Sequence, residues 1–131
     1  ISALKNKTLY QRASSIQRHK MNLTNTELSL VNELDNSKAH DVVTINVSKI
    51  TSEMVSMIIA TGNSTRHVKS VSMAITEFAK NQDIKVIGIE GQNSGEWVLI
   101  DLGDTVVHVM LSETRKLYDL EKLWSQPKPA V

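Results

Sequence analysis

The stretch that decides the fold is residues 54–90, which read MVSMIIATGNSTRHVKSVSMAITEFAKNQDIKVIGIE. Residues 54–61 are apolar on both faces, which is typical of a strand covered on both sides. Apolar residues then recur at helical spacing, so we expect a helix over residues 65–81. Residues 84–90 predict a further strand. A strand, a helix and a strand joined by short links favour a right-handed βαβ unit with its two strands parallel.

The sequence before this stretch predicts one more helix and one more strand. Thr24 and Glu27 have the spacing of a capping box, in which each residue hydrogen-bonds the backbone of the other. We therefore expect a helix over residues 25–35. The β-branched run at residues 42–47 predicts a strand.

The sequence after it predicts a hairpin and a last helix. Residues 96–101 and 104–110 read as strands, with Gly103 supplying the positive φ of a tight turn. Ser112 is expected to cap a helix whose buried stripe is Leu117, Leu120 and Trp124. The sum is a single α/β domain, a mixed five-stranded sheet with flanking helices.

Composition excludes several classes of protein. The chain has 131 residues and no cysteine, so disulfides, thiolate metal sites and cysteine nucleophiles are ruled out. The longest apolar run, Met57–Ala60, is far too short to cross a membrane. From Met21 on, the chain has ten basic and fourteen acidic residues, which gives a net charge of −4. A body of that charge favours a neutral or basic partner, and we expect no specific nucleic-acid binding.

The first twenty residues differ from the rest. They hold five basic residues, no acid and little apolar periodicity. We interpret residues 1–20 as an extension or a segment left from expression, disordered and outside the packed domain. The alternative is the remnant of an organelle transit peptide, since such peptides are basic, serine-rich and poor in acids. The domain then covers residues 21–124, with a tail at residues 125–131.

No residue pattern favours catalysis or metal binding. The four histidines lack the spacing of metal ligands, and His108, between valines on a strand, is expected to be a hydrogen-bonded structural residue. Residues 61–66 lie where a strand passes into a helix, where backbone N–H groups can hold a phosphate and Arg66 would add charge. The segment lacks the second glycine and the lysine of a P-loop, and helix capping explains it equally well.

A minimal nucleotidyltransferase needs two carboxylates flanking one residue on the strand after such a turn. Residues 85–90 offer only Glu90. Asp101 and Asp104 bracket the hairpin turn at a spacing that suits turn capping better than a two-metal site. We therefore expect neither catalytic residues nor a cofactor or metal.

Three apolar residues are candidates for contact with a partner. Trp97 lies on the strand face opposite Val98, although burial in the core is equally compatible with its position. Leu102 is at the hairpin tip, where burial is difficult. Tyr118 follows Leu117 by one position, about 100° round the helix, so it cannot share the middle of the same buried stripe.

Four segments resemble the ribosomal silencing factor family RsfS, also called Iojap or YbeB. Residues 38–43 and 59–68 resemble its opening motifs, residues 90–110 its central signature and residues 117–124 its closing signature. The resemblance runs in order and spacing from about Met21 to Trp124. It implies a nucleotidyltransferase-like fold without transferase activity.

The resemblance also implies a function. Members bind the large ribosomal subunit through ribosomal protein uL-fourteen, block association with the small subunit and repress translation in starvation. The family's contact residues carry over to Trp97, Leu102 and Tyr118; Arg66, Asp104 and Leu120 are secondary candidates. A homodimer off the ribosome and a bacterial cytoplasmic location are also implied, with an organelle as the alternative. The competing class is a divergent nucleotidyltransferase that uses Gly62–Ser64 with Asp101 and Asp104.

Overall fold

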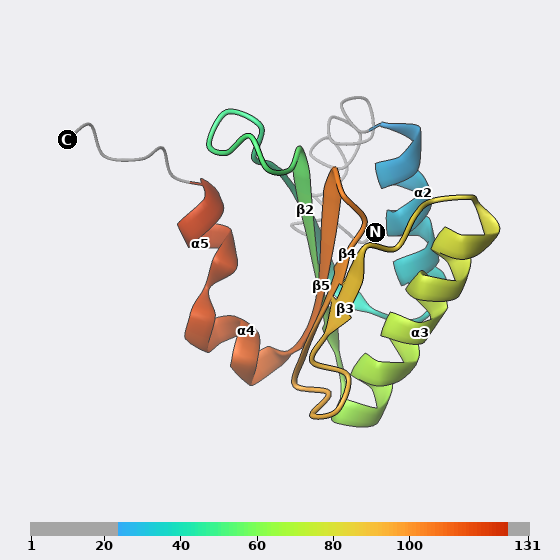
Figure 1. The fold of residues 1–131 in the computed structure, drawn as a ribbon. Helices are drawn as coiled ribbons and strands as arrows, with labels where there is room; N and C mark the ends of the chain where they lie inside the picture. The colour runs from blue at the N-terminus through green and yellow to red at the C-terminus, as the bar shows by residue number, and fades with distance from the viewer. Residues whose placement is uncertain (1–23, 126–131) are drawn as a thin grey trace.

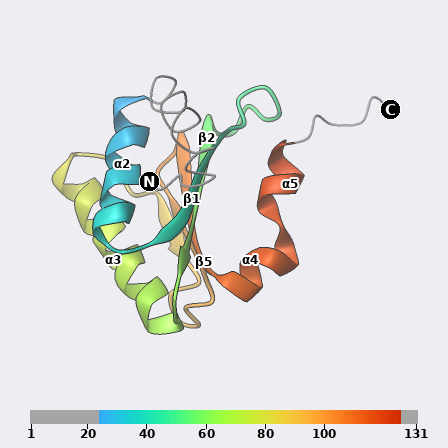
Figure 2. The same cartoon turned by 180° about the vertical axis from the view of Figure 1, so that it is seen from behind.

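A five-stranded sheet lies between two pairs of helices (Figures 1 and 2). The computed structural model describes residues 24–125, and the expectations for residues 1–20 lie outside them. α2 (Asn25–Asn36) and α3 (Thr65–Asn81) cover one face of the sheet, and α4 (Ser112–Tyr118) and α5 (Leu120–Ser125) lie against the other. The strands are β1 (His40–Asn46), β2 (Ser56–Gly62), β3 (Gly88–Glu90), β4 (Trp97–Asp101) and β5 (Thr105–Leu111). The α/β class and the mixed five-stranded sheet are confirmed.

The strand order is β1-β2-β5-β4-β3. β2 and β5 are parallel, and the other three pairs of neighbours are antiparallel. β2 and β3 therefore run in the same direction, as predicted, but two strands separate them. β5 pairs with β2 along seven residues, which is a longer ladder than the three residues of β3 could form.

β3 is shorter than predicted because the chain before it bonds elsewhere. The N–H of Ile84 donates to the carbonyl of Ala79 at the end of α3, at 2.8 Å. Only at Ile87, whose N–H donates to the carbonyl of Asp101, does the chain meet β4. The strand pattern in residues 84–87 thus reflects packing against the core rather than pairing.

The two long helices begin as the sequence predicts. The Thr24 hydroxyl accepts from the N–H of Glu27, whose carboxylate accepts from the N–H of Thr24, so the capping box is complete. Ser64 caps α3 by accepting from the N–H of His67. The His67 ring then joins the helices: Nδ1 accepts from the N–H of Asn63, and Nε2 lies 3.0 Å from the carbonyl oxygen of Ser37.

The last helix is two short helices instead of one. α4 ends at Tyr118, and its C-cap residue Asp119 adopts a left-handed conformation with φ +45°. α5 follows at once and reaches Ser125, which the sequence analysis places in the tail. Ser112 does not cap α4; Leu111 is the N-cap residue and makes no side-chain cap bond. Because of this break, the three residues of the expected buried stripe do not lie on one helix face. Leu117 is 77% exposed, while Leu120 is buried and Trp124 is half-buried.

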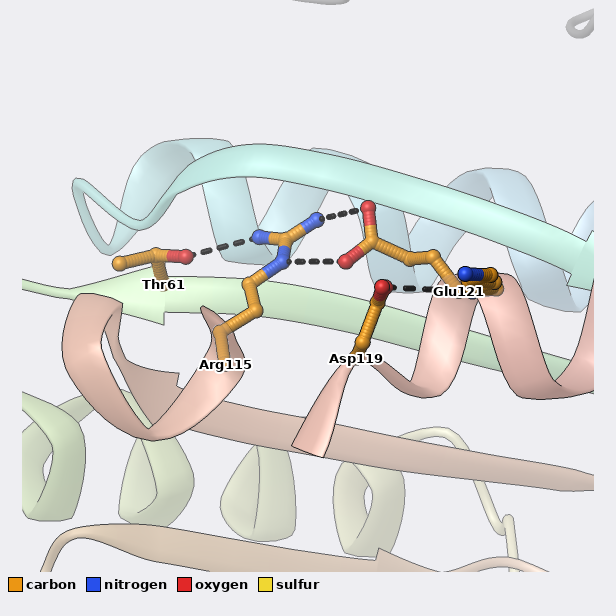
Figure 3. A network of polar contacts seen from close by, with 5 residues as sticks. Thr61, Arg115, Asp119 and Glu121 are labelled. Atoms are coloured by element: carbon orange, nitrogen blue, oxygen red, sulfur yellow. Dashed lines mark hydrogen bonds and ion pairs between the residues drawn. The ribbon is translucent and has the colours of Figure 1, made fainter. Parts of the chain in front are cut away.

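An ion pair spans this break. Arg115 on α4 makes two hydrogen bonds to the carboxylate of Glu121 on α5, at 2.9 and 3.0 Å (Figure 3). The same guanidinium donates to the hydroxyl of Thr61 on β2 at 2.7 Å. Asp119 accepts from the N–H of Lys122 and so caps the first turn of α5. These contacts tie both short helices to the sheet.

Candidate partner-binding surface

The two faces of the sheet are covered unequally. The face under α2 and α3 carries the larger core, which includes Leu30, Ile58 and Val107. The face under α4 and α5 carries a small cluster of four buried residues: Met57, Ile59, Met110 and Leu120. Thirteen helical residues cannot cover a five-stranded sheet. Apolar side chains at the edge of this second cluster therefore remain partly exposed.

Trp97 and Tyr118 meet at that edge. Trp97, the first residue of β4, is half-buried, and Tyr118, the last residue of α4, is 54% exposed. Their ring centroids are 4.9 Å apart with an interplanar angle of 48°, a tilted contact within the favourable range for aromatic pairs. The structure thus brings two of the three predicted contact residues together, on the surface.

His108 lies beneath Trp97. The register pairs Leu99 with His108 and Trp97 with Met110, so the Trp97 and His108 side chains are diagonal neighbours on one face. The indole Nε1–H of Trp97 donates to Nδ1 of His108 at 2.9 Å. Burial lowers the pKa of His108 from 6.5 to about 4, so the ring is neutral at physiological pH. The prediction of a hydrogen-bonded structural histidine is confirmed.

Leu102 does not belong to this surface. Its side chain is only 9% exposed and packs in the larger core, with Val98 and Ile100. The prediction that a hairpin tip would expose it is wrong, because Leu102 continues the alternation of β4 toward the α2 and α3 face. It also lies five residues from Trp97, about 16 Å along an extended chain.

The three secondary candidates for partner contact lie in different parts of the fold. Leu120 is buried beneath α5 and supports the surface from below. Arg66 is exposed in the first turn of α3. Asp104 is exposed at the β4–β5 turn, where its carbonyl accepts from the N–H groups of Val55 and Ser56. It therefore lies at the opposite end of the hairpin from Trp97.

Two exposed leucines on the same pair of helices were not predicted. Leu117 on α4 and Leu123 on α5 are 77% and 65% exposed. A continuous helix would have buried Leu117, and no sequence signal marks the left-handed residue at Asp119. With Tyr118, these leucines make the α4–α5 surface markedly apolar.

The residues of the alternative enzyme do not meet. Gly62 pairs with Leu111 at one end of the sheet, whereas Asp101 pairs with Val106 at the other, five residues away along β5 and about 17 Å. The Asp101 carboxylate accepts from the N–H of Gly103, whose φ is +93°, as in turn capping. In residues 24–125, three or more potential metal ligands nowhere gather. That part of the chain also contains no helix long and apolar enough to span a membrane.

Comparison with known proteins gives a consistent result. The family model described as "Ribosomal silencing factor during starvation" (RsfS) matches residues 20–131. A Chromobacterium violaceum protein named ribosomal silencing factor RsfS is 43% identical over 76% of this chain and 82% of its own length. A Bacillus subtilis protein of the same name is 37% identical over 69% of this chain and 76% of its own. A mouse protein, mitochondrial assembly of ribosomal large subunit protein 1, is 33% identical over 73% of this chain and 43% of its own.

Two crystal structures of bacterial proteins have a similar fold. A crystal structure of a Chromobacterium violaceum protein has a TM-score of 0.74 at 42% identity, covering 83% of this chain and 94% of that one. A crystal structure of a Bacillus halodurans protein has a TM-score of 0.68 at 38% identity, covering 82% of this chain and all of that one.

Proposed function

The chain belongs to the ribosomal silencing factor family RsfS, and from this we propose how it acts. It binds the large ribosomal subunit through ribosomal protein uL-fourteen, and its bulk then blocks association with the small subunit. Translation falls as a result when nutrients are short. The observation that carries the proposal is the tilted aromatic pair of Trp97 and Tyr118 at the surface.

The chemistry of this surface suits a protein partner. Binding energy at protein interfaces concentrates in a few aromatic and apolar anchors, and Tyr and Trp are the residues most enriched among them. The body of the chain carries a net charge of −4, which is complementary to a basic ribosomal protein and repelled by bare RNA. The mouse relative is named for assembly of the large ribosomal subunit.

The proposed contact set is narrower than the resemblance implies. Trp97 and Tyr118 make the contact, with Arg66 as a charged candidate outside the aromatic pair. Leu102 acts by filling the core beneath the hairpin, since its side chain is buried. Truncating Leu102 should therefore lower stability first and binding only as a consequence.

Sedimentation with purified large subunits tests the contact. Tyr118→Ala should weaken binding by about 2 kcal/mol, roughly thirtyfold, while the domain stays folded. Met73→Ala is the matched control, because Met73 is 69% exposed but lies on α3, across the sheet. Circular dichroism verifies folding. A folded Tyr118→Ala variant that binds as tightly as the parent would refute the site.

Subunit-association profiles test the mechanism separately. If the factor acts by occupying the joining surface, inhibition of joining must fall in parallel with binding. A variant that binds weakly yet blocks joining as well as the parent would refute the steric model. The salt dependence of binding should also be shallow, since few phosphates are contacted.

A second copy of the chain is a further proposed partner. Exposed Leu117 and Leu123 supply apolar surface for a homodimer off the ribosome. Sedimentation equilibrium should show a dimer for the parent and a shift to monomer for Leu123→Ser. A parent that is monomeric at micromolar concentration would exclude it.

Transfer activity is not expected. The related bacterial proteins are named as silencing factors, and the residues of the alternative site lie at opposite ends of the sheet. Incubation with nucleoside triphosphates and Mg²⁺ or Mn²⁺ should give no product. Turnover that disappears in Asp101→Ala would support the enzyme instead.

A further inference from the structure

A buried histidine accepts a hydrogen bond from Trp97, one of the proposed contact residues. His108 is 4% exposed in the middle of β5, between two valines that face the larger core. Its Nδ1 accepts from the indole Nε1–H, and the ring centroids are 5.9 Å apart. The indole nitrogen is the one polar atom in the Trp97 side chain. The bond therefore fixes the inner edge of the indole and leaves an apolar edge toward the surface.

One ring nitrogen of this histidine has no hydrogen-bond partner in the described part of the chain. When Nδ1 accepts a hydrogen bond, the proton of the neutral ring must lie on Nε2. Nε2 is buried and has no hydrogen-bond partner within residues 24–125. A buried donor without a partner is destabilising. An apolar side chain at this position would remove that donor, but it would also take away the acceptor of the Trp97 indole N–H. The other residues at positions 106–110 are all apolar. The imidazole thus leaves one buried nitrogen unpaired, and its other nitrogen accepts from Trp97.

We propose that His108 is a positioning residue for the contact surface: by accepting the indole N–H, it holds the Trp97 ring in the tilted contact with Tyr118 that the partner meets. This inference rests on the proposed function, in which those two rings make the contact. An anchor that is already fixed loses less conformational freedom on binding, and affinity rises accordingly. A histidine that only fills space would leave affinity unchanged when replaced by a side chain of similar shape.

Substitution separates positioning from packing. His108→Leu and His108→Phe both remove the acceptor, one with an aliphatic side chain of similar volume and one with a planar but larger ring. Each should bind large subunits about three- to tenfold more weakly while the domain stays folded. His108→Asn places an oxygen near the position of Nδ1 and should recover most of the affinity. Trp97→Phe removes the donor, so adding His108→Leu to it should weaken binding no further.

Nuclear magnetic resonance of the parent tests the geometry without any variant. The Trp97 indole proton should exchange slowly with solvent, with the Trp124 indole signal as the internal comparison, and the ring nitrogens of His108 should report the Nε2–H tautomer. In His108→Phe, the Trp97 indole proton should exchange faster. A fast-exchanging Trp97 proton in the parent, or the opposite tautomer, would overturn the inference.

The binding data keep the two proposals distinguishable. If Tyr118→Ala binds normally, the proposed function fails, whereas indole exchange still decides whether His108 orders Trp97. If Tyr118→Ala binds weakly while His108→Leu and His108→Phe, both folded, bind as the parent does, the contact stands and positioning by His108 is overturned.

Discussion

His108 should make the stability of the domain depend on pH in a way that one substitution removes. Burial lowers its pKa to about 4 in the folded state, against 6.5 in the unfolded chain. Above pH 6.5 the ring is neutral in both states, and its contribution to stability is complete. As the pH falls below 6.5, His108 becomes protonated in the unfolded chain but stays neutral in the folded protein. The free energy of unfolding therefore decreases. Below about pH 4 both states are protonated and the decrease stops.

The size of the effect follows from the pKa difference of about 2.5 units. At about 1.4 kcal/mol per unit, the domain should lose about 3 kcal/mol between pH 6.5 and pH 4 through this residue. That is a large share of the roughly 5–15 kcal/mol that a typical domain has in total.

The contribution of His108 can be measured by urea denaturation of the parent and of His108→Phe, at half-unit steps from pH 7 to pH 4. Subtracting the two curves removes every titrating group that the proteins share. The difference should shift in favour of the variant by about 1.4 kcal/mol per unit below pH 6.5. Parallel curves would refute both the lowered pKa and the buried neutral ring.

Three further predictions test the residues that support the surface, each by urea denaturation. Gly91→Ala should destabilise the domain by more than about 2 kcal/mol, because Gly91 has φ +90° and an added Cβ would meet the Trp97 carbonyl oxygen at 2.0 Å. Asp119→Gly should be about 1 kcal/mol more stable than Asp119→Ala, since both lose the cap but only glycine adopts φ +45° freely. Arg115→Met and Glu121→Gln should show a coupling energy of about 1 kcal/mol in a double-mutant cycle.

Helix caps, apolar periodicity and turn glycines correctly predicted the elements that depend on interactions between residues close in sequence. The capping serine and the helical stripe placed α3 at residues 65–81, which are its observed bounds. The positive φ of Gly103 placed the hairpin turn. In each case, the interaction that fixes the element lies within a few residues in sequence.

Features that depend on distant contacts were missed. The break at Asp119 is held by the bonds from Arg115 to Glu121 and to Thr61, which is fifty-four positions away in the sequence. The prediction for Leu102 is wrong because the alternation of β4 continues into the turn and directs this side chain into the larger core. The pairing of Trp97 with Tyr118 depends on how α4 folds back, which no periodicity encodes.

The parallel pairing of β2 with β5 also sets the order in which the domain can form. Ser56 and Thr105, whose hydroxyls bond at 2.9 Å across this pair, are 49 residues apart in the chain. Closing so long a loop is slow, because the entropy is lost before the contact is gained. Trp97 pairs with β5, and Tyr118 is the last residue of α4, the helix that begins directly after that strand. A chain that has not yet been extended through β5 and α4 therefore cannot hold Trp97 against Tyr118.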